Sequence, residues 1–304
     1  MSKIITVFGS TGQQGGAVLR ALLKAGDYHV RAITRSANSD KAKKLAGLKN
    51  VTVHEADLDN PASLGPVLKG AHGAFLVTDF SAHFDQREVK QGTSLIDAAI
   101  SNSVKHVVFS GLENCQSVIK KPVYHFDYKA EIEDYALKHA DKINFTSIRL
   151  SAFYQETVSG MLYKAAPNTW IFTPPIADKP MYVVNVDNIG VMAATVFAHP
   201  EEYRSKILPV AGDQLTADEI VDTLNRNLAP NKFMNGHFTL EKFLTFGFPG
   251  VVDIANMFEY FQSGAMKRDI NLAKQLNGEV TNLNDWLVAN KDNILSSLAK
   301  KENH

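Results

Sequence analysis

Short apolar runs and amphipathic stretches alternate through the first half of the chain. The apolar, β-branched runs predict six strands, at residues 3–8, 29–34, 51–55, 74–78, 106–110 and 145–150. Apolar residues at helical spacing predict helices at 14–24, 87–102 and 126–139. Strands that alternate with helices pair in parallel through right-handed crossovers. The first half therefore predicts an α/β fold with a doubly wound parallel sheet.

The pattern changes after residue 150. Residues 151–184 contain Pro167, Pro174, Pro175 and Pro180 and show no clear alternation of strands and helices. Beyond them, apolar spacing predicts helices at 187–197, 239–245, 251–261 and 283–290. Thr216 and Glu219 form a capping box that opens one more helix. We expect residues 1–152 to form the sheet domain, with helix 187–197 returning to it, and residues 153–304 to form a second, smaller mixed α/β domain.

Composition narrows the classes of function. Lys and Arg (32) balance Asp and Glu (32), so the basic excess of a direct nucleic-acid binder is missing. No apolar run approaches the roughly 18–20 residues that span a bilayer, and no signal peptide is evident. A single cysteine, Cys115, excludes an internal disulfide framework and a cysteine-rich metal site. We expect a cytoplasmic protein, also compatible with the nucleus, that binds no metal, membrane or nucleic acid directly.

Three glycines follow the first predicted strand at a regular spacing. Gly9, Gly12 and Gly15 lie in the segment Gly-Ser-Thr-Gly-Gln-Gln-Gly, where the first helix opens. A dinucleotide pyrophosphate needs close backbone approach and the free amides of a helix amino end, which this strand–loop–helix arrangement supplies. A tight turn without a ligand is the alternative. The three glycines are predicted to hold the pyrophosphate, and Gln14 of the same segment is also predicted to bind the cofactor.

The residues after the second strand indicate which dinucleotide binds. NAD-preferring sites place an acid there for the ribose 2′-hydroxyl, whereas this chain has Arg35, whose guanidinium can pair with a 2′-phosphate. The predicted cofactor is therefore NADP(H). Asp57 and Leu58, after the third strand, are predicted at the adenine edge, although a turn-capping Asp would look the same.

The catalytic residues of a short-chain dehydrogenase are only partly present. These enzymes place a tyrosine four residues before a lysine on one helix face, with a serine from the preceding strand. Ser110 and Lys129 fit the serine and the lysine, but His125 stands at the tyrosine position. Histidine still performs acid–base chemistry near neutral pH, so Ser110, His125 and Lys129 are candidates only. A surface-helix histidine without a catalytic role is the commoner interpretation of His125.

Several blocks together resemble one known family. They are Val7 to Gly16, Glu88 to Gly92, Ser110 to Asn114, His125 to Lys129, Ser147 to Leu150, Gly247 to Gly250 and Ala255 to Phe258. In these blocks the chain is similar to the NmrA-like branch of the atypical short-chain dehydrogenases. The similarity extends over nearly the whole chain.

The resemblance implies a fold, a cofactor and a set of contacts. Members combine an NADP-binding Rossmann domain with a smaller mixed domain, and fungal members bind transcription factors. Matched by position, the cofactor contacts would be Gly9, Thr11, Gly12, Gln13, Gly15, Arg35, Thr78 and Lys129. Ala152, Phe153 and Tyr154 would lie near the nicotinamide, although Tyr154 is equally compatible with a wall of the cleft that touches no ligand.

Two functions follow as hypotheses. In the first, the protein senses the NADPH/NADP ratio and regulates a protein partner such as a transcription factor. Such a sensor needs a mobile element near the cofactor, for which residues 79–87 and 165–181 are candidates. In the second, it is an NADPH-dependent reductase of quinones or other carbonyl compounds. The missing tyrosine favours the sensor, and the sequence leaves a homodimer open.

Overall fold

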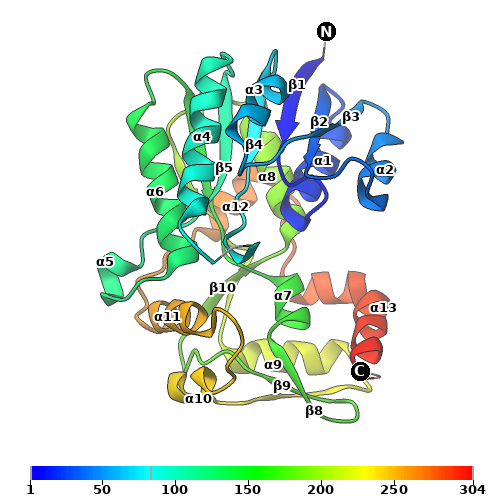
Figure 1. Cartoon of the computed structure of the whole chain (residues 1–304). Coiled ribbons are helices and arrows are strands. Elements are labelled where there is room, and N and C mark those ends of the chain that lie inside the picture. Colours follow the sequence, from blue (N-terminus) through cyan, green and yellow to red (C-terminus); the bar gives the residue numbers. More distant parts are fainter. Residues whose placement is uncertain (1, 83, 303–304) are drawn as a thin grey trace.

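A seven-stranded parallel sheet forms one half of the molecule (Figure 1). The structure is a computed structural model that describes residues 2–82 and 84–302. The sheet has the order β11-β6-β5-β4-β1-β2-β3, and its neighbouring strands all pair in parallel. The strands are β1 (Lys3–Val7), β2 (Tyr28–Thr34), β3 (Val51–Glu55), β4 (Gly73–Leu76), β5 (His106–Gly111), β6 (Asn144–Arg149) and β11 (Ile207–Pro209). The predicted doubly wound α/β fold is confirmed, and the short strand β11 is an addition that the sequence pattern did not indicate.

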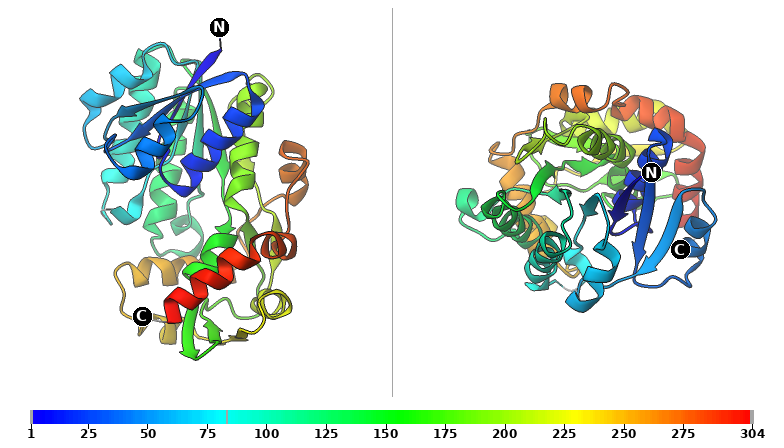
Figure 2. Two further views of the ribbon diagram at one scale, coloured as in Figure 1. Left: turned by 90° about the vertical axis from the view of Figure 1, so that its right-hand side faces the viewer. Right: turned by 90° about the horizontal axis from the view of Figure 1, so that it is seen from above.

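Helices cover both faces of this sheet, as a doubly wound fold requires. One face carries α1 (Gln13–Ala25) and α8 (Val186–Ala198), and Figure 2 shows these two helices side by side. The other carries α3 (Leu64–Leu68), α4 (Arg87–Ser101) and α6 (Tyr124–Lys138). At the α1–α8 contact, a Cβ atom on Gly190 would lie 2.3 Å from the carbonyl oxygen of Ala17. Only glycine therefore allows these helices to approach so closely.

Parts of the second half of the chain return to the sheet. Helix α8 packs on α1, α12 (Ile270–Leu276) packs on α8, and β11 pairs with β6. Buried Ile189, Met192 and Phe197 of α8 share one apolar cluster with Ile5 of β1 and Val30 of β2. Burial of such side chains contributes about 1.5–3 kcal/mol each.

A second group of elements forms the smaller domain at the other end of the molecule (Figure 1). It contains two three-stranded sheets, of order β12-β10-β7 and β13-β9-β8. Its strands are β7 (Ala152–Phe153), β8 (Leu162–Ala166), β9 (Thr169–Phe172), β10 (Met181–Val184), β12 (Asp213–Leu215) and β13 (Lys232–Asn235). Its helices are α7 (Tyr154–Ser159), α9 (Ala217–Asn227), α10 (Leu240–Leu244), α11 (Val251–Gln262) and α13 (Leu283–Glu302).

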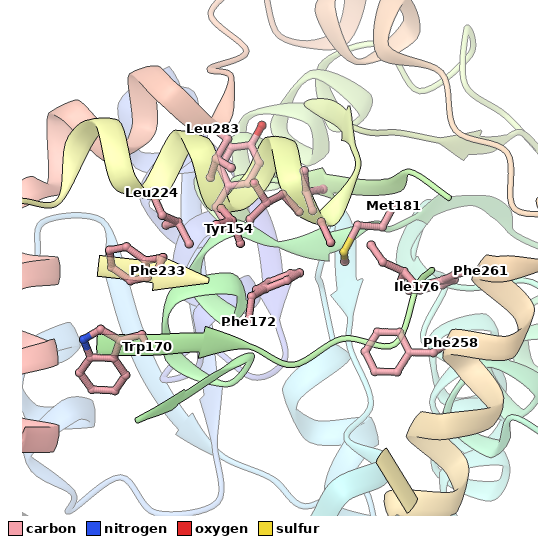
Figure 3. Close-up of a cluster of buried hydrophobic side chains, with 14 of the residues drawn as sticks. Tyr154, Trp170, Phe172, Ile176, Met181, Leu224, Phe233, Phe258, Phe261 and Leu283 are labelled. Carbon is pink, nitrogen blue, oxygen red and sulfur yellow. The ribbon is translucent and has the colours of Figure 1, made fainter. Parts of the chain in front are cut away.

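An aromatic core holds this domain together. Trp170, Phe172 and Tyr154 are almost fully buried and, with Phe258 and Phe261 of α11, belong to one cluster (Figure 3). The proline-containing segment 151–184 contributes three of these residues and contains four strands and a helix. Those elements are two to six residues long, which is too short for a periodic pattern to stand out.

Smaller differences from the predicted elements concern helices. The capping box at Thr216 is present, with Glu219 bonded back to the cap. The last helix continues to Glu302 rather than ending near residue 290. The short helices α2 (Asp40–Ala46), α3, α5 (Gln116–Ile119) and α12 were not predicted. Among residues 2–82 and 84–302, no helix combines the length and apolarity that crossing a bilayer demands.

Candidate functional site

The glycine loop forms a tight cradle between β1 and α1. Gly9 has φ +65°, and the Gly12 amide donates a hydrogen bond to the Gly9 carbonyl oxygen at 2.9 Å. A Cβ atom on Gly15 would lie 2.3 Å from that same oxygen, so no other residue fits there. Gly12 is the N-cap of α1 and provides no side chain to its amides. These amides are therefore available to an anion.

A cavity of about 550 Å³ opens beside this loop, at the carboxyl edge of the parallel strands. Ligands of open α/β sheets bind at this edge. The predicted cofactor residues that line it are Gly9, Thr11, Gly12, Gln13, Gln14, Gly15, Arg35, Asp57, Leu58, Thr78 and Phe153. The glycine cradle, the free helix end and the cavity together fit a dinucleotide, with its pyrophosphate at Gly9–Gly15.

At the β2–β3 side of the cavity, one cation faces the solvent. Arg35 follows β2 and is exposed. Glu55, which ends β3 opposite Thr34 of β2, accepts a hydrogen bond from the amide of Ala37 at 2.7 Å. Asp57 lines the cavity, and its Oδ1 also accepts from the amide of Asp59 at 3.0 Å. Asp57 thus caps a turn while facing the cavity, so both interpretations of this residue agree with the structure.

Lys129 lies behind the cavity wall rather than in it. Its Nζ donates to Glu88 Oε1 at 2.6 Å, to Thr78 Oγ1 at 2.7 Å and to the Thr78 carbonyl oxygen at 3.1 Å. The Lys129 side chain is 11% exposed and that of Glu88 only 1%. The charge of Lys129 is therefore balanced by a buried carboxylate, and among the three residues only Thr78 lines the cavity.

Ser110 is likewise one layer below the cavity. Its hydroxyl donates to Gln14 Oε1 at 2.6 Å, and the residue is buried at the end of β5. Gln14 lines the cavity, so Ser110 orients a wall residue. A substrate in the cavity would meet Gln14 before it met the serine hydroxyl.

His125 lies at the junction between the two domains. Its Nδ1 is hydrogen-bonded to Asp253 of α11, which also accepts from the Tyr124 amide at 2.5 Å. The imidazole ring lies 6.3 Å from the ring of Phe80, and the side chain is 20% exposed. Helix α6 begins at Tyr124, earlier than predicted, so His125 stands in its first turn. His125 does not line the cavity.

Tyr154 is placed in the core of the second domain, away from the cavity. Its hydroxyl donates to Asp213 Oδ2 at 3.1 Å and to the Thr281 carbonyl oxygen at 3.2 Å. Burial and the Asp213 carboxylate raise the pKa of Tyr154 far above its ordinary value. Phe153 ends β7 and Tyr154 begins α7, and of the two only Phe153 lines the cavity. Ala152 is not among the lining residues either.

The cavity also contains residues that the sequence did not indicate. Among them are Asp59, Gln91 and Glu156, and Asp79 and Ala82 line the cavity as well. Asp79 and Ala82 belong to the segment 79–87 proposed as a mobile element, in which His83 is outside the described residues. Gln91 Nε2 donates to Asp59 Oδ1 at 2.7 Å. Glu156 lies on α7, a helix that no periodicity predicted.

Cys115 is a buried thiol of the domain junction. Burial, helped by the carboxylates of Glu113 and Asp127, raises its pKa well above the ordinary value. Since the thiolate is the reactive form, this cysteine behaves as a small apolar residue. Among the described residues, no cluster of three or more His, Cys, Asp or Glu could hold a metal ion.

Comparisons with known proteins agree with this geometry. The model of the NmrA-like family matches residues 1–287. An NmrA-like family domain-containing protein of Dictyostelium discoideum is 28% identical over 242 residues, which cover 74% of this chain and 78% of that protein. NmrA, a negative transcriptional regulator, was crystallised in complex with NAD (18% identity, TM-score 0.82, 98% of each chain) and with NADP (17%, 0.81, 97% of each chain). An NADPH-dependent quinone oxidoreductase of Escherichia coli, complexed with NADPH, shares 22% identity and a TM-score of 0.75 over 93% of this chain and 98% of that one.

Proposed function

Since the chain belongs to the NmrA-like family and has its NAD(P)-binding fold, we propose that it is an NADP(H)-binding regulatory protein that reads the NADPH/NADP balance and acts through a protein partner. One observation carries the regulatory part of this proposal. None of the three candidate catalytic residues lines the cavity, and the side chain of each is bonded to another protein side chain: Ser110 to Gln14, Lys129 to Glu88 and His125 to Asp253. A cavity that binds a dinucleotide but presents none of these groups to a substrate suits a sensor better than an enzyme.

The choice of NADP(H) over NAD(H) rests on Arg35. This guanidinium lies on the cavity wall where an NAD-preferring site would hold the ribose hydroxyls with an acid. The nearby acid, Glu55, is engaged by the backbone of the Arg35 loop. A 2′-phosphate would find a bidentate donor here, whereas a 2′-hydroxyl would find no carboxylate acceptor at this position.

The regulatory role draws on the relatives as well as on the cavity. The solved neighbour NmrA is a negative transcriptional regulator, and we extend regulation through a protein partner to this chain. A sensor must bind the oxidised and the reduced cofactor with different consequences for its conformation. In the segment 79–87, Asp79 and Ala82 line the cavity, and the ring of Phe80 lies beside His125 at the domain junction. This segment therefore connects the proposed cofactor site with the junction.

A reductase of quinones or other carbonyl compounds is the second candidate. The observation that favours it is the His125–Asp253 pair, because a carboxylate that orients an imidazole is a common arrangement for acid–base catalysis. The quinone oxidoreductase among the solved neighbours has the same fold. In this alternative NADPH, held at the glycine loop, would supply the hydride, and the His125 imidazole would supply the proton for the substrate oxygen.

One experiment distinguishes the two functions. NADPH and NADP⁺ are titrated into the purified protein while the turnover of a quinone panel is followed in the same samples. The sensor predicts binding of both cofactors, slow or no turnover, and a difference between them in hydrogen exchange of residues 79–87 or in light-scattering mass. Robust turnover that collapses in both His125→Ala and Lys129→Ala would overturn the sensor and establish the reductase.

A further inference from the structure

The second domain reaches the cofactor cavity through helix α7. Among the described residues that line the cavity, Phe153 and Glu156 alone come from beyond residue 91. Among the described residues, Glu156 carries the only charge that this domain contributes to the wall. In Figure 1, α7 lies between the sheet domain and the rest of the second domain.

The Glu156 carboxylate sits at the amino end of α1. Its Oε1 accepts a hydrogen bond at 3.2 Å from Nε2 of Gln13, the first residue of that helix. The first turn of α1 contains no acidic residue, and its N-cap is Gly12. The positive end of the helix dipole, which a dinucleotide pyrophosphate would use, thus has a protein carboxylate as its neighbour.

We infer that Glu156 is an autoinhibitory residue of the cofactor site, whose carboxylate holds the amino end of α1 until the cofactor pyrophosphate expels it and releases α7. The inference rests on the proposed dinucleotide site. The pyrophosphate carries two negative charges and the carboxylate one, so the two repel each other when both lie beside the same helix end. Binding must then break the Gln13–Glu156 hydrogen bond and move the carboxylate outward.

Movement of α7 would affect the rest of the second domain, because both ends of this six-residue helix are hydrogen-bonded to other elements of that domain. At its start, the buried Tyr154 hydroxyl is bonded to Asp213 and Thr281. At its end, the Ser159 carbonyl oxygen accepts a hydrogen bond from Lys301 of α13. Release of Glu156 would therefore displace both ends of α7 and their hydrogen-bond partners. In this way cofactor binding would alter the position of α13.

The first test compares cofactor affinity in Glu156→Gln with that of the unmodified protein. Glutamine keeps the shape and removes the charge, so NADP⁺ and NADPH should both bind about threefold to tenfold more tightly at low salt. The gain should shrink toward unity as salt rises from about 0.01 M to about 1 M, because the Debye length falls from about 30 Å to about 3 Å. The control is Glu241→Gln on exposed helix α10, which should leave both affinities unchanged.

The second test measures hydrogen exchange of residues 154–162, which report on release of α7. Saturating NADP⁺ should raise exchange in the unmodified protein, whereas Glu156→Ala, which removes the acceptor of the Gln13 hydrogen bond, should exchange rapidly without cofactor and change little on adding it. Gln13→Ala breaks the same hydrogen bond from the other side and should raise exchange of α7 in the cofactor-free protein.

The outcomes separate this inference from the proposed function. If the unmodified protein binds NADP⁺, Glu156→Gln shows the same affinity and Glu156→Ala shows the same exchange, Glu156 is not autoinhibitory, although the cofactor site stands. If the unmodified protein binds neither NADP⁺ nor NADPH, the proposed function itself fails. A salt-independent gain in affinity would also overturn the electrostatic part of the inference.

Discussion

At the glycine loop, three glycines line the cavity, and the amino end of α1 has no side-chain cap, so its amides are available to an anion. At the domain junction, by contrast, the charged side chains face one another. The Glu113 carboxylate accepts hydrogen bonds from Nη1 and Nη2 of Arg268, at 2.9 and 2.8 Å. The Asp253 carboxylate is hydrogen-bonded to His125 and to the Tyr124 amide. The first region is arranged for a ligand that comes from outside. The second has already satisfied its own charges, so a perturbation there should cost stability before it costs binding.

The largest expected effect is the loss of stability when the buried Glu113–Arg268 pair at the domain junction is broken. The Arg268 side chain is 1% exposed and also donates to the Leu150 carbonyl oxygen at 2.7 Å. Arg268→Met leaves the Glu113 carboxylate buried without its cation, so the free energy of unfolding should fall by about 3–5 kcal/mol. Urea denaturation measures this change. Adding Glu113→Gln should restore part of it, because the uncompensated charge is then removed.

A matched control lies on the surface. Lys121 pairs with Glu259 at 2.6 Å, but its side chain is 53% exposed. Lys121→Met should therefore cost less than about 1 kcal/mol. Equal losses for Lys121→Met and Arg268→Met would show that the junction is not the closed, buried network described above.

The next largest loss of stability is expected on replacing Lys129, which lies between the glycine loop and the domain junction. Lys129→Met leaves buried Glu88 with Thr78 as its only remaining hydrogen-bond donor among the described residues, so it should lose about 3 kcal/mol of unfolding free energy. The double variant Lys129→Met, Glu88→Gln should recover much of that loss. Thermal and urea unfolding measure both. An unchanged free energy of unfolding in Lys129→Met would contradict the stabilising role of the Lys129–Glu88 pair. It would favour a role of Lys129 in binding the cofactor.

Gly15→Ala tests the ligand-facing region. The added Cβ atom would lie 2.3 Å from the Gly9 carbonyl oxygen, so the turn must shift away from the position that receives the pyrophosphate. Cofactor affinity should fall by about a hundredfold, equivalent to about 2.7 kcal/mol. Gly278→Ala is the control, because a Cβ atom there meets nothing within 4 Å. Calorimetric titration with NADP⁺ would contradict the cradle if both variants bound like the unmodified protein.

The same contrast explains what the sequence could predict. The ligand-facing region is built from loops that directly follow β1, β2 and β3, so Gly9–Gly15, Arg35 and Asp57 were placed by their position after a strand. The junction depends on pairs far apart in the chain, such as His125 with Asp253 and Glu113 with Arg268. Spacing within one helix placed His125 beside Lys129, but it contained no information about α11.

A short helix explains why the sequence placed Tyr154 near the cofactor and did not indicate Glu156. Tyr154 and Glu156 lie on α7, a six-residue helix whose first and third residues point to different sides. A pattern of that length does not show which side chain turns toward the cavity. Phe153, which directly precedes α7, lines the cavity, whereas the adjacent Tyr154 enters the aromatic core (Figure 3).

The smallest expected effect concerns Arg35 and separates the two cofactors. The guanidinium is exposed, so solvent and salt screen its attraction to a 2′-phosphate, and Arg35→Ala should weaken NADP(H) by about tenfold. NAD(H), which lacks that phosphate, should bind the variant as it binds the unmodified protein. Arg87→Ala, which removes an exposed cation paired with Asp85 outside the cavity lining, is the control and should change neither affinity. Equal affinities of the unmodified protein for NADP(H) and NAD(H) would contradict the proposed preference for NADP(H). They would leave the glycine cradle as the common feature of a site that accepts either dinucleotide, because the cradle contacts only the pyrophosphate that both cofactors carry.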